Sequence, residues 1–215
     1  MASRKNTIKV ERFINQLMGS NCYLVVDAES SHCLCIDPAS EKSEQEITYI
    51  EEKGLTLDNI ILTHEHTDHT WGVNALVDRY PFVKVICSEL CKAELPKDAL
   101  FYFQLYYDNP NYSYNVKRVD CTTEELNWHL SWEDHEIHFI ATPGHSPGSI
   151  CIAIENMIFG GDTLMPFKPY VKERNGGSIE LFQKSIKKIS ENYPDDMMVY
   201  PGHGEMGILK DYKQA

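Results

Sequence analysis

The most informative segment of this 215-residue chain reads Thr63-His64-Glu65-His66-Thr67-Asp68-His69-Thr70. It places four side chains of metal-binding type directly after Asn59–Leu62, an apolar run that predicts a buried strand. Imidazole and carboxylate groups suit zinc and related first-row ions. In an extended backbone the first two histidines point the same way, whereas Asp68 and His69 begin the next predicted helix and can face elsewhere. The spacing therefore favours ligands for two adjacent metals over a merely polar loop.

Three later segments repeat this pattern in a looser form. In each, a predicted strand runs into a glycine-containing turn that presents one residue of ligand type: Thr142-Pro143-Gly144-His145, Gly160-Gly161-Asp162-Thr163 and Pro201-Gly202-His203-Gly204. Glycine permits close backbone approach, and loops at strand ends often hold functional groups on a rigid scaffold. The candidate metal ligands are thus five histidines and two aspartates, too many for one zinc but suited to two: His64, His66, Asp68, His69, His145, Asp162 and His203.

Hydrophobic periodicity predicts the remaining elements. We expect further strands at Thr7–Phe13, Cys22–Val26, Cys33–Ile36, Val83–Cys87, Ile137–Ala141, Ser149–Ile154, Met157–Phe159 and Met197–Tyr200. Helices are expected at Ser43–Lys53, with a capping box between Ser43 and Glu46, and at Thr70–Arg79, Ser88–Leu95 and Ser178–Asn192. Strands at both ends with interspersed helices predict an α+β protein in which two packed sheets have helices outside. We expect one domain over residues 1–215.

Composition narrows the class of protein. Hydrophobic residues make up 42% and charged residues 24%, which is ordinary globular usage and excludes a disordered or fibrous chain. The net charge of −12 disfavours nucleic acid as a partner. The apolar runs are far shorter than the roughly 20 residues of a membrane span, and we expect neither membrane contact nor a secretory signal. Seven cysteines without a CxxC pair predict free thiols and a cytoplasmic protein.

An aromatic-rich insertion is expected over residues 96–120. Within it, Leu100–Tyr114 is dense in tyrosine and phenylalanine. Such density occurs in cores, and tyrosine is also common at pocket rims and interfaces, where one end of the ring is wet. Core packing, a substrate lid and a subunit interface of a homodimer therefore all remain open.

The ordered set of motifs resembles one known family. His-x-His-x-Asp-His followed by Gly-His, Gly-Asp and Pro-Gly-His is similar to the metallo-β-lactamase fold superfamily, and most similar to its glyoxalase II-like hydrolase branch. Asn21-Cys22-Tyr23-Leu24-Val25 and Ile36-Asp37-Pro38 also resemble the early strands of that branch. The likeness covers the chain from about Val10 to Gly204. It is specific for the superfamily and much less so for the substrate.

The resemblance implies a four-layer αββα sandwich with a dinuclear site at one edge between the sheets. His64, His66 and His145 would hold one metal, Asp68, His69 and His203 the other, and Asp162 would bridge the two. The implied cofactors are two Zn²⁺, with Fe or Mn as alternatives. The implied reaction is attack of a metal-bound hydroxide on a small ester or thioester, with Asp68 as the catalytic residue that orients the nucleophile. True zinc β-lactamases place no bridging Asp at position 162, so antibiotic hydrolysis is disfavoured.

Departures from the branch leave the substrate open. Glyoxalase II proper has a C-terminal helical domain that binds glutathione, and the stretch of twelve residues after His203 is too short for it, which puts glutathione thioesters in doubt as substrates. Lys168, Lys172 and Arg174 are either a carboxylate-binding group or solvated charges. Glu65 and Thr67 are either orienting groups for the imidazoles or solvated. The alternatives to a hydrolase are a mononuclear iron enzyme resembling persulfide dioxygenases, a phosphodiesterase or nuclease of the same fold, and a non-catalytic binding module.

Overall fold

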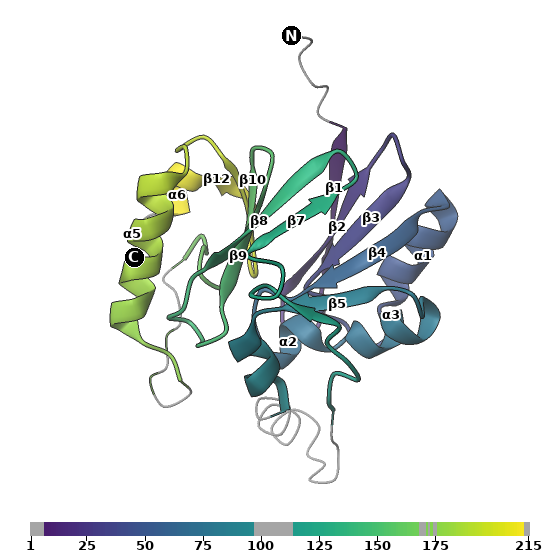
Figure 1. Ribbon diagram of the computed structural model, residues 1–215, viewed down its shortest axis with the longest axis horizontal. Coiled ribbons are helices and arrows are strands. Elements are labelled where there is room, and N and C mark those ends of the chain that lie inside the picture. Colours follow the sequence, from purple (N-terminus) through teal and green to yellow (C-terminus); the bar gives the residue numbers. More distant parts are fainter. Residues whose placement is uncertain (1–6, 97–113, 168–170, 172, 174–175, 213–215) are drawn as a thin grey trace.

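A computed structural model describes residues 7–96, 114–167, 171, 173 and 176–212. Its strands form two six-stranded sheets, ordered β1-β2-β3-β4-β5-β6 and β12-β11-β10-β9-β8-β7. The sheets pack face to face, with α1 and α3 outside the first and α5 outside the second (Figure 1). The expected four-layer αββα sandwich is thereby confirmed.

The first sheet contains the N-terminal half of the chain. Its three leading strands pair antiparallel and the next three pair parallel. Their bounds are β1 Ile8–Ile14, β2 Asn21–Asp27, β3 His32–Ile36, β4 Thr56–Ile61, β5 Lys84–Cys87 and β6 Cys121–Thr122. Every residue of β2 is buried because this strand is covered on both faces. The two-residue β6 was not predicted, since so short a strand has no recognisable periodicity.

The second sheet contains the C-terminal half. Its strands are β7 His129–Trp132, β8 His135–Ala141, β9 Ile150–Ile154, β10 Met157–Gly161, β11 Met198–Pro201 and β12 Gly207–Ile208. Pairing is antiparallel throughout except between β10 and β11, which run parallel. The parallel pair requires a crossover, and α5 provides it. The carboxyl ends of β10 and β11 therefore lie side by side.

The helices are α1 Glu44–Lys53, α2 Thr67–Thr70, α3 Val73–Arg79, α5 Ile179–Asn192 and α6 Leu209–Tyr212. Residues 89–96 are also helical. Among the described residues, no helix is long and apolar enough to cross a membrane.

Two helix predictions need correction. The capping box at α1 is wrong: Ser43 adopts φ 43° and makes no side-chain cap, and Glu46 is buried instead of reaching back to the helix start. The single helix predicted over Thr70–Arg79 is broken between α2 and α3, where the Gly72 amide donates to the Pro38 carbonyl at 2.7 Å. A Cβ at Gly72 would lie 2.6 Å from the Ser40 carbonyl oxygen, so the close approach needs glycine.

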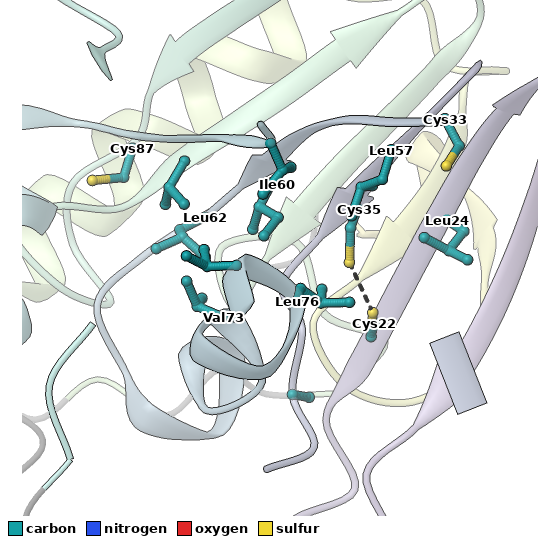
Figure 2. Packing of buried hydrophobic residues seen from close by; sticks show 14 of the residues in the cluster. Cys22, Leu24, Cys33, Cys35, Leu57, Ile60, Leu62, Val73, Leu76 and Cys87 are labelled. Carbon is teal, nitrogen blue, oxygen red and sulfur yellow. Dashed lines mark hydrogen bonds between the residues drawn. The ribbon is translucent and has the colours of Figure 1, made fainter. Parts of the chain in front are cut away.

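Alternation along the strands produces separate apolar layers. In β2, Tyr23 and Val25 face the second sheet, whereas Cys22 and Leu24 face the helices. Figure 2 shows the helix-side layer, where Leu62, Val73 and Leu76 pack beside the strand residues and the Cys22 and Cys35 thiols lie 3.6 Å apart. A third layer packs α5 against the second sheet. All seven cysteines are free, as predicted, and all but Cys121 are buried.

Candidate metal centre

All seven candidate ligands lie together at one edge of the sandwich, in loops that follow strands of both sheets. His64 and His66 follow β4, and α2 carries the next two ligands, Asp68 and His69. Three further ligands come from the loops after β8, β10 and β11: His145, Asp162 and His203. The seven residues are spread from position 64 to position 203, and they meet because β4, β8, β10 and β11 all end at this edge of the sandwich.

Three imidazoles form the first group of donor atoms, which we call the three-histidine group. His66 Nδ1 lies 3.1 Å from His64 Nε2 and 2.9 Å from His145 Nε2. Tetrahedral coordination at a Zn–N distance of 2.0–2.1 Å would separate ligand nitrogens by about 3.3 Å. The three nitrogens are therefore close to the spacing that one ion requires.

The second group contains one carboxylate and two imidazoles, and we call it the aspartate group. His203 Nε2 lies 3.3 Å from both Asp68 Oδ2 and His69 Nε2. His69 Nε2 is 3.6 Å from Asp68 Oδ2. These are the three residues that the family resemblance implies for the second metal.

Asp162 lies between the two groups. Its Oδ2 is 3.4 Å from His145 Nε2 in the three-histidine group and 3.7 Å from His203 Nε2 in the aspartate group. Its Oδ1 is buried, makes no hydrogen bond within the described residues and lies 3.4 Å from His69 Nε2 in the aspartate group. A buried carboxylate that faces imidazoles of both groups fits a cation, so the residues present suit a pair of metal ions.

The pKa values of the histidines shift in opposite directions in the two groups: they are lowered in the three-histidine group, whereas that of His69 in the aspartate group is raised. Burial lowers the pKa of His64 and His145, and burial with the nearby His145 lowers the pKa of His66 to about 3. These imidazoles are therefore neutral at ordinary pH, which is the form that binds metal. Burial would also lower the pKa of His69, but neighbouring carboxylates, with Asp68 first, outweigh it and raise that pKa to about 10. A cation entering the aspartate group must displace this proton.

Asp37 orients two of the ligands, although it was not among the residues expected at the site. This buried side chain follows β3 with φ 52°, and its carboxylate accepts the Thr63 amide at 2.7 Å and the Thr63 hydroxyl at 2.6 Å. Because that hydroxyl already donates to Asp37, the Nδ1–H of His64 donates to Thr63 at 3.0 Å. His69 donates from Nδ1 to Asp37 at 3.1 Å. Both imidazoles thereby present Nε2 to the site.

The start of β2 holds the loop that carries His203. The Asn21 side chain donates to the carbonyls of Pro201 and Gly204, both at 2.9 Å, and the Tyr23 hydroxyl donates to Pro201 at 2.7 Å. Gly202 then packs so closely that a Cβ there would lie 2.2 Å from Asp162 Oδ1. This loop therefore depends on residues about 180 positions away in the sequence.

The remaining predictions concern Glu65, Thr67, the other histidines and the aromatic insertion. Glu65 is buried and bonded to Ser146, so its assignment as a solvated residue is excluded. Thr67 is likewise buried. The chain has four further histidines, His32, His129, His135 and His138, and none belongs to either ligand group; His32 pairs with Asp58 and His135 with Glu155, each at 2.8 Å. Most of the aromatic insertion lies outside the described residues, as do Lys168, Lys172 and Arg174.

A family model and several relatives identify the family of this chain. Residues 16–203 match the metallo-beta-lactamase superfamily, and the chain belongs to it. It is 28% identical over 84% of its length to a hydroxyacylglutathione hydrolase of Aeromonas hydrophila, and it spans 60% of that relative. It is 29% identical over 85% of its length to PksB of Bacillus subtilis, described as a probable polyketide biosynthesis zinc-dependent hydrolase, and spans 72% of it.

A solved structure gives the same result for the fold. The crystal structure of BLEG-1, described as a B3 metallo-beta-lactamase, superposes with a TM-score of 0.83 at 25% identity. The match covers 94% of this chain and 95% of that one. The chain is accordingly a member of the metallo-beta-lactamase superfamily.

Proposed function

We propose that this protein is a dinuclear metal-dependent hydrolase of a small ester or thioester, with all seven candidate residues as metal ligands. The observation that carries the proposal is Asp162, whose two carboxylate oxygens lie within 3.7 Å of imidazoles from both groups. A carboxylate shared by two ligand groups is the usual arrangement of a two-metal site. Two Zn²⁺ are the proposed cofactors.

When bound, a pair of divalent cations lowers the pKa of water toward neutrality and polarises a carbonyl oxygen. The chain supplies the geometry for this chemistry. The neutral imidazoles of the three-histidine group bind without first losing a proton, because their pKa values are lowered. Burial would raise the pKa of Asp68, but His69 and His203 outweigh it and hold that pKa well below its usual range. Asp68 therefore stays an acceptor that can orient a nucleophilic water.

The ester or thioester class is supported by relatives and by the kind of site. One relative is named for hydrolysing a hydroxyacylglutathione, a thioester, and another is described as a zinc-dependent hydrolase of polyketide biosynthesis. This chain spans less than two thirds of the first of these, so glutathione thioesters are tested beside other acyl substrates. The proposed partner is accordingly a small molecule, and the seven free thiols support a reducing, cytoplasmic compartment.

Metal content and a substrate panel test the proposal together. Protein purified without added metal is analysed for metal per chain and then assayed with thioesters, lactones, phosphodiesters and β-lactams. Two zinc ions per chain with thioester or ester turnover is the expected result. One iron per chain, with oxygen uptake on a persulfide, would contradict it.

β-Lactam hydrolysis is a second candidate because of the BLEG-1 structure, which superposes over nearly the whole chain. Turnover of a β-lactam with no turnover of thioesters or esters would favour this candidate over the first.

A further inference from the structure

Glu65 stands between two candidate ligands in the sequence, and its side chain is buried. It takes no part in the groups of metal-type donor atoms found among the described residues. Instead, its Oε2 accepts a hydrogen bond of 2.9 Å from the hydroxyl of Ser146, a residue 81 positions later in the chain. Ser146 directly follows His145. Glu65 lies between two candidate ligands from the first sheet. It is therefore hydrogen-bonded to the residue that follows His145, a candidate ligand from the second sheet.

The Ser146 hydroxyl is part of a buried network. It lies 2.9 Å from the Ser149 hydroxyl, and that hydroxyl also accepts the Ser146 amide at 3.2 Å. The Gly148 carbonyl accepts the Ser88 hydroxyl at 2.7 Å. A Cβ at Gly148 would lie 2.7 Å from Glu65 Oε2 and 2.4 Å from the backbone nitrogen of Cys91. The loop is packed directly against the Glu65 carboxylate, with no room for a larger residue.

The geometry of the three-histidine group makes this contact important. Two of its imidazoles belong to a loop of the first sheet, and the third, His145, belongs to a loop of the second. The spacing of their nitrogens therefore depends on what joins the two loops. A backbone bond from Ile150 to the Thr63 carbonyl, at 2.8 Å, joins them on one side of the ligands. Glu65 and Ser146 join them next to His145 itself, through the buried hydrogen bond of 2.9 Å.

We propose that Glu65 is a positioning residue that sets His145 against His64 and His66, and so controls the affinity of the three-histidine group for its metal. This inference rests on the proposed two-metal function. It predicts an effect confined to one of the two sites, because the aspartate group is held by other contacts, from Asp37 and Asn21.

Single-site backgrounds test this directly. His203→Ala leaves the three-histidine group as the intact set, and His145→Ala leaves the aspartate group. Glu65→Ala is added to each, and Zn²⁺ affinity is measured by competition with a chromophoric chelator, without reference to turnover. Replacing an outer carboxylate of a metal site typically costs 10–100-fold in affinity. We expect a loss of about that size in the His203→Ala background and less than about twofold in the His145→Ala background.

Two further variants separate positioning from general destabilisation. Ser146→Ala removes only the partner hydroxyl and should weaken the same site, by about tenfold. Glu65→Gln keeps an acceptor oxygen and should restore part of the affinity lost in Glu65→Ala. Ser131→Ala is the matched control, because it deletes a serine that bonds Glu136 in an exposed pair of the same sheet, and it should leave both sites unchanged.

The outcomes distinguish this inference from the proposed function. Equal weakening of both sites by Glu65→Ala, or unchanged affinity at the three-histidine group in both Glu65→Ala and Ser146→Ala, would overturn the positioning role. If the unsubstituted protein itself fails to bind a second metal ion, the two-metal function fails instead.

Discussion

Asp37→Asn tests how the aspartate group is organised. Asn keeps the shape of the side chain and tolerates the positive φ of 52° at this position, so the backbone should not change. The carboxylate now accepts three hydrogen bonds, two from Thr63 and one from His69. An amide offers a single acceptor oxygen, and its NH₂ group faces one of these donors. At least one hydrogen bond to a charged group is therefore lost.

Such a bond contributes about 2 kcal/mol. If the loss falls on the orientation of His69, it corresponds to about 30-fold weaker metal binding. A second effect concerns protons: Asp37 is one of the carboxylates that raise the pKa of His69 to about 10. Without its charge that pKa falls, and the pH above which metal affinity stops rising should move down.

Chelator competition with Zn²⁺ at several pH values between 6 and about 10 measures both effects, the upper limit being set by the raised pKa of His69. Asp58→Asn is a suitable control because it alters a carboxylate–histidine pair outside the site. An affinity and a pH profile equal to those of the unsubstituted protein would refute the orienting role of Asp37.

Three further predictions concern stability. Glu46→Gln should raise the free energy of unfolding at pH 7 by about 1 kcal/mol in urea titrations, because burial raises the pKa of Glu46 and its ionisation above the ordinary 4.5 destabilises the fold. The gain should shrink as the pH falls toward 4.5, and a loss of stability at pH 7 would contradict the reasoning. His32→Asn should lower the melting temperature most below pH 6.5, since the hydrogen bond to Asp58 raises the pKa of His32 and its contribution is lost as the pH rises through that raised value. The His32–Asp58 pair is partly exposed, so its contribution to the free energy of unfolding should be about 0.5 kcal/mol or less. A difference in melting temperature between His32→Asn and the unsubstituted protein that grows with pH would contradict this prediction. Gly202→Ala should cost about 1–3 kcal/mol in thermal unfolding and also weaken metal binding, because its Cβ would lie 2.2 Å from Asp162 Oδ1. Unfolding and metal affinity equal to those of the unsubstituted protein would show that the loop yields without cost.

The candidate ligands could be predicted from the sequence because their signal is local. Each stands in or directly after a turn that ends a predicted strand, so residue type and position suffice to select it. The fold followed for a similar reason, since a continuous apolar run such as Cys22–Val26 marks a strand that is covered on both faces.

The groups that orient the ligands could not be predicted, because they depend on contacts between distant loops. Asp37 also ends a strand, so the rule that selected the ligands could have found it, but its bond to His69 exists only in the folded chain. Asn21 and Glu65 have partners 180 and 81 positions away. No local pattern records such pairings.

The errors have the same origin. Ser43 and Glu46 have the spacing of a capping box, but burial of Glu46 against the first sheet outweighs the cap. The helix predicted through Gly72 breaks because that residue packs on the Pro38–Ser40 turn. In both places tertiary packing overrides a correct local tendency.

Anomalous diffraction from crystals of the zinc-loaded protein would locate the metal ions themselves. We expect two peaks roughly 3.5–4 Å apart, one among His64, His66 and His145 and one among Asp68, His69 and His203, with an Asp162 carboxylate oxygen between them. A single peak, or two peaks with Asp162 bound to neither, would contradict this expectation.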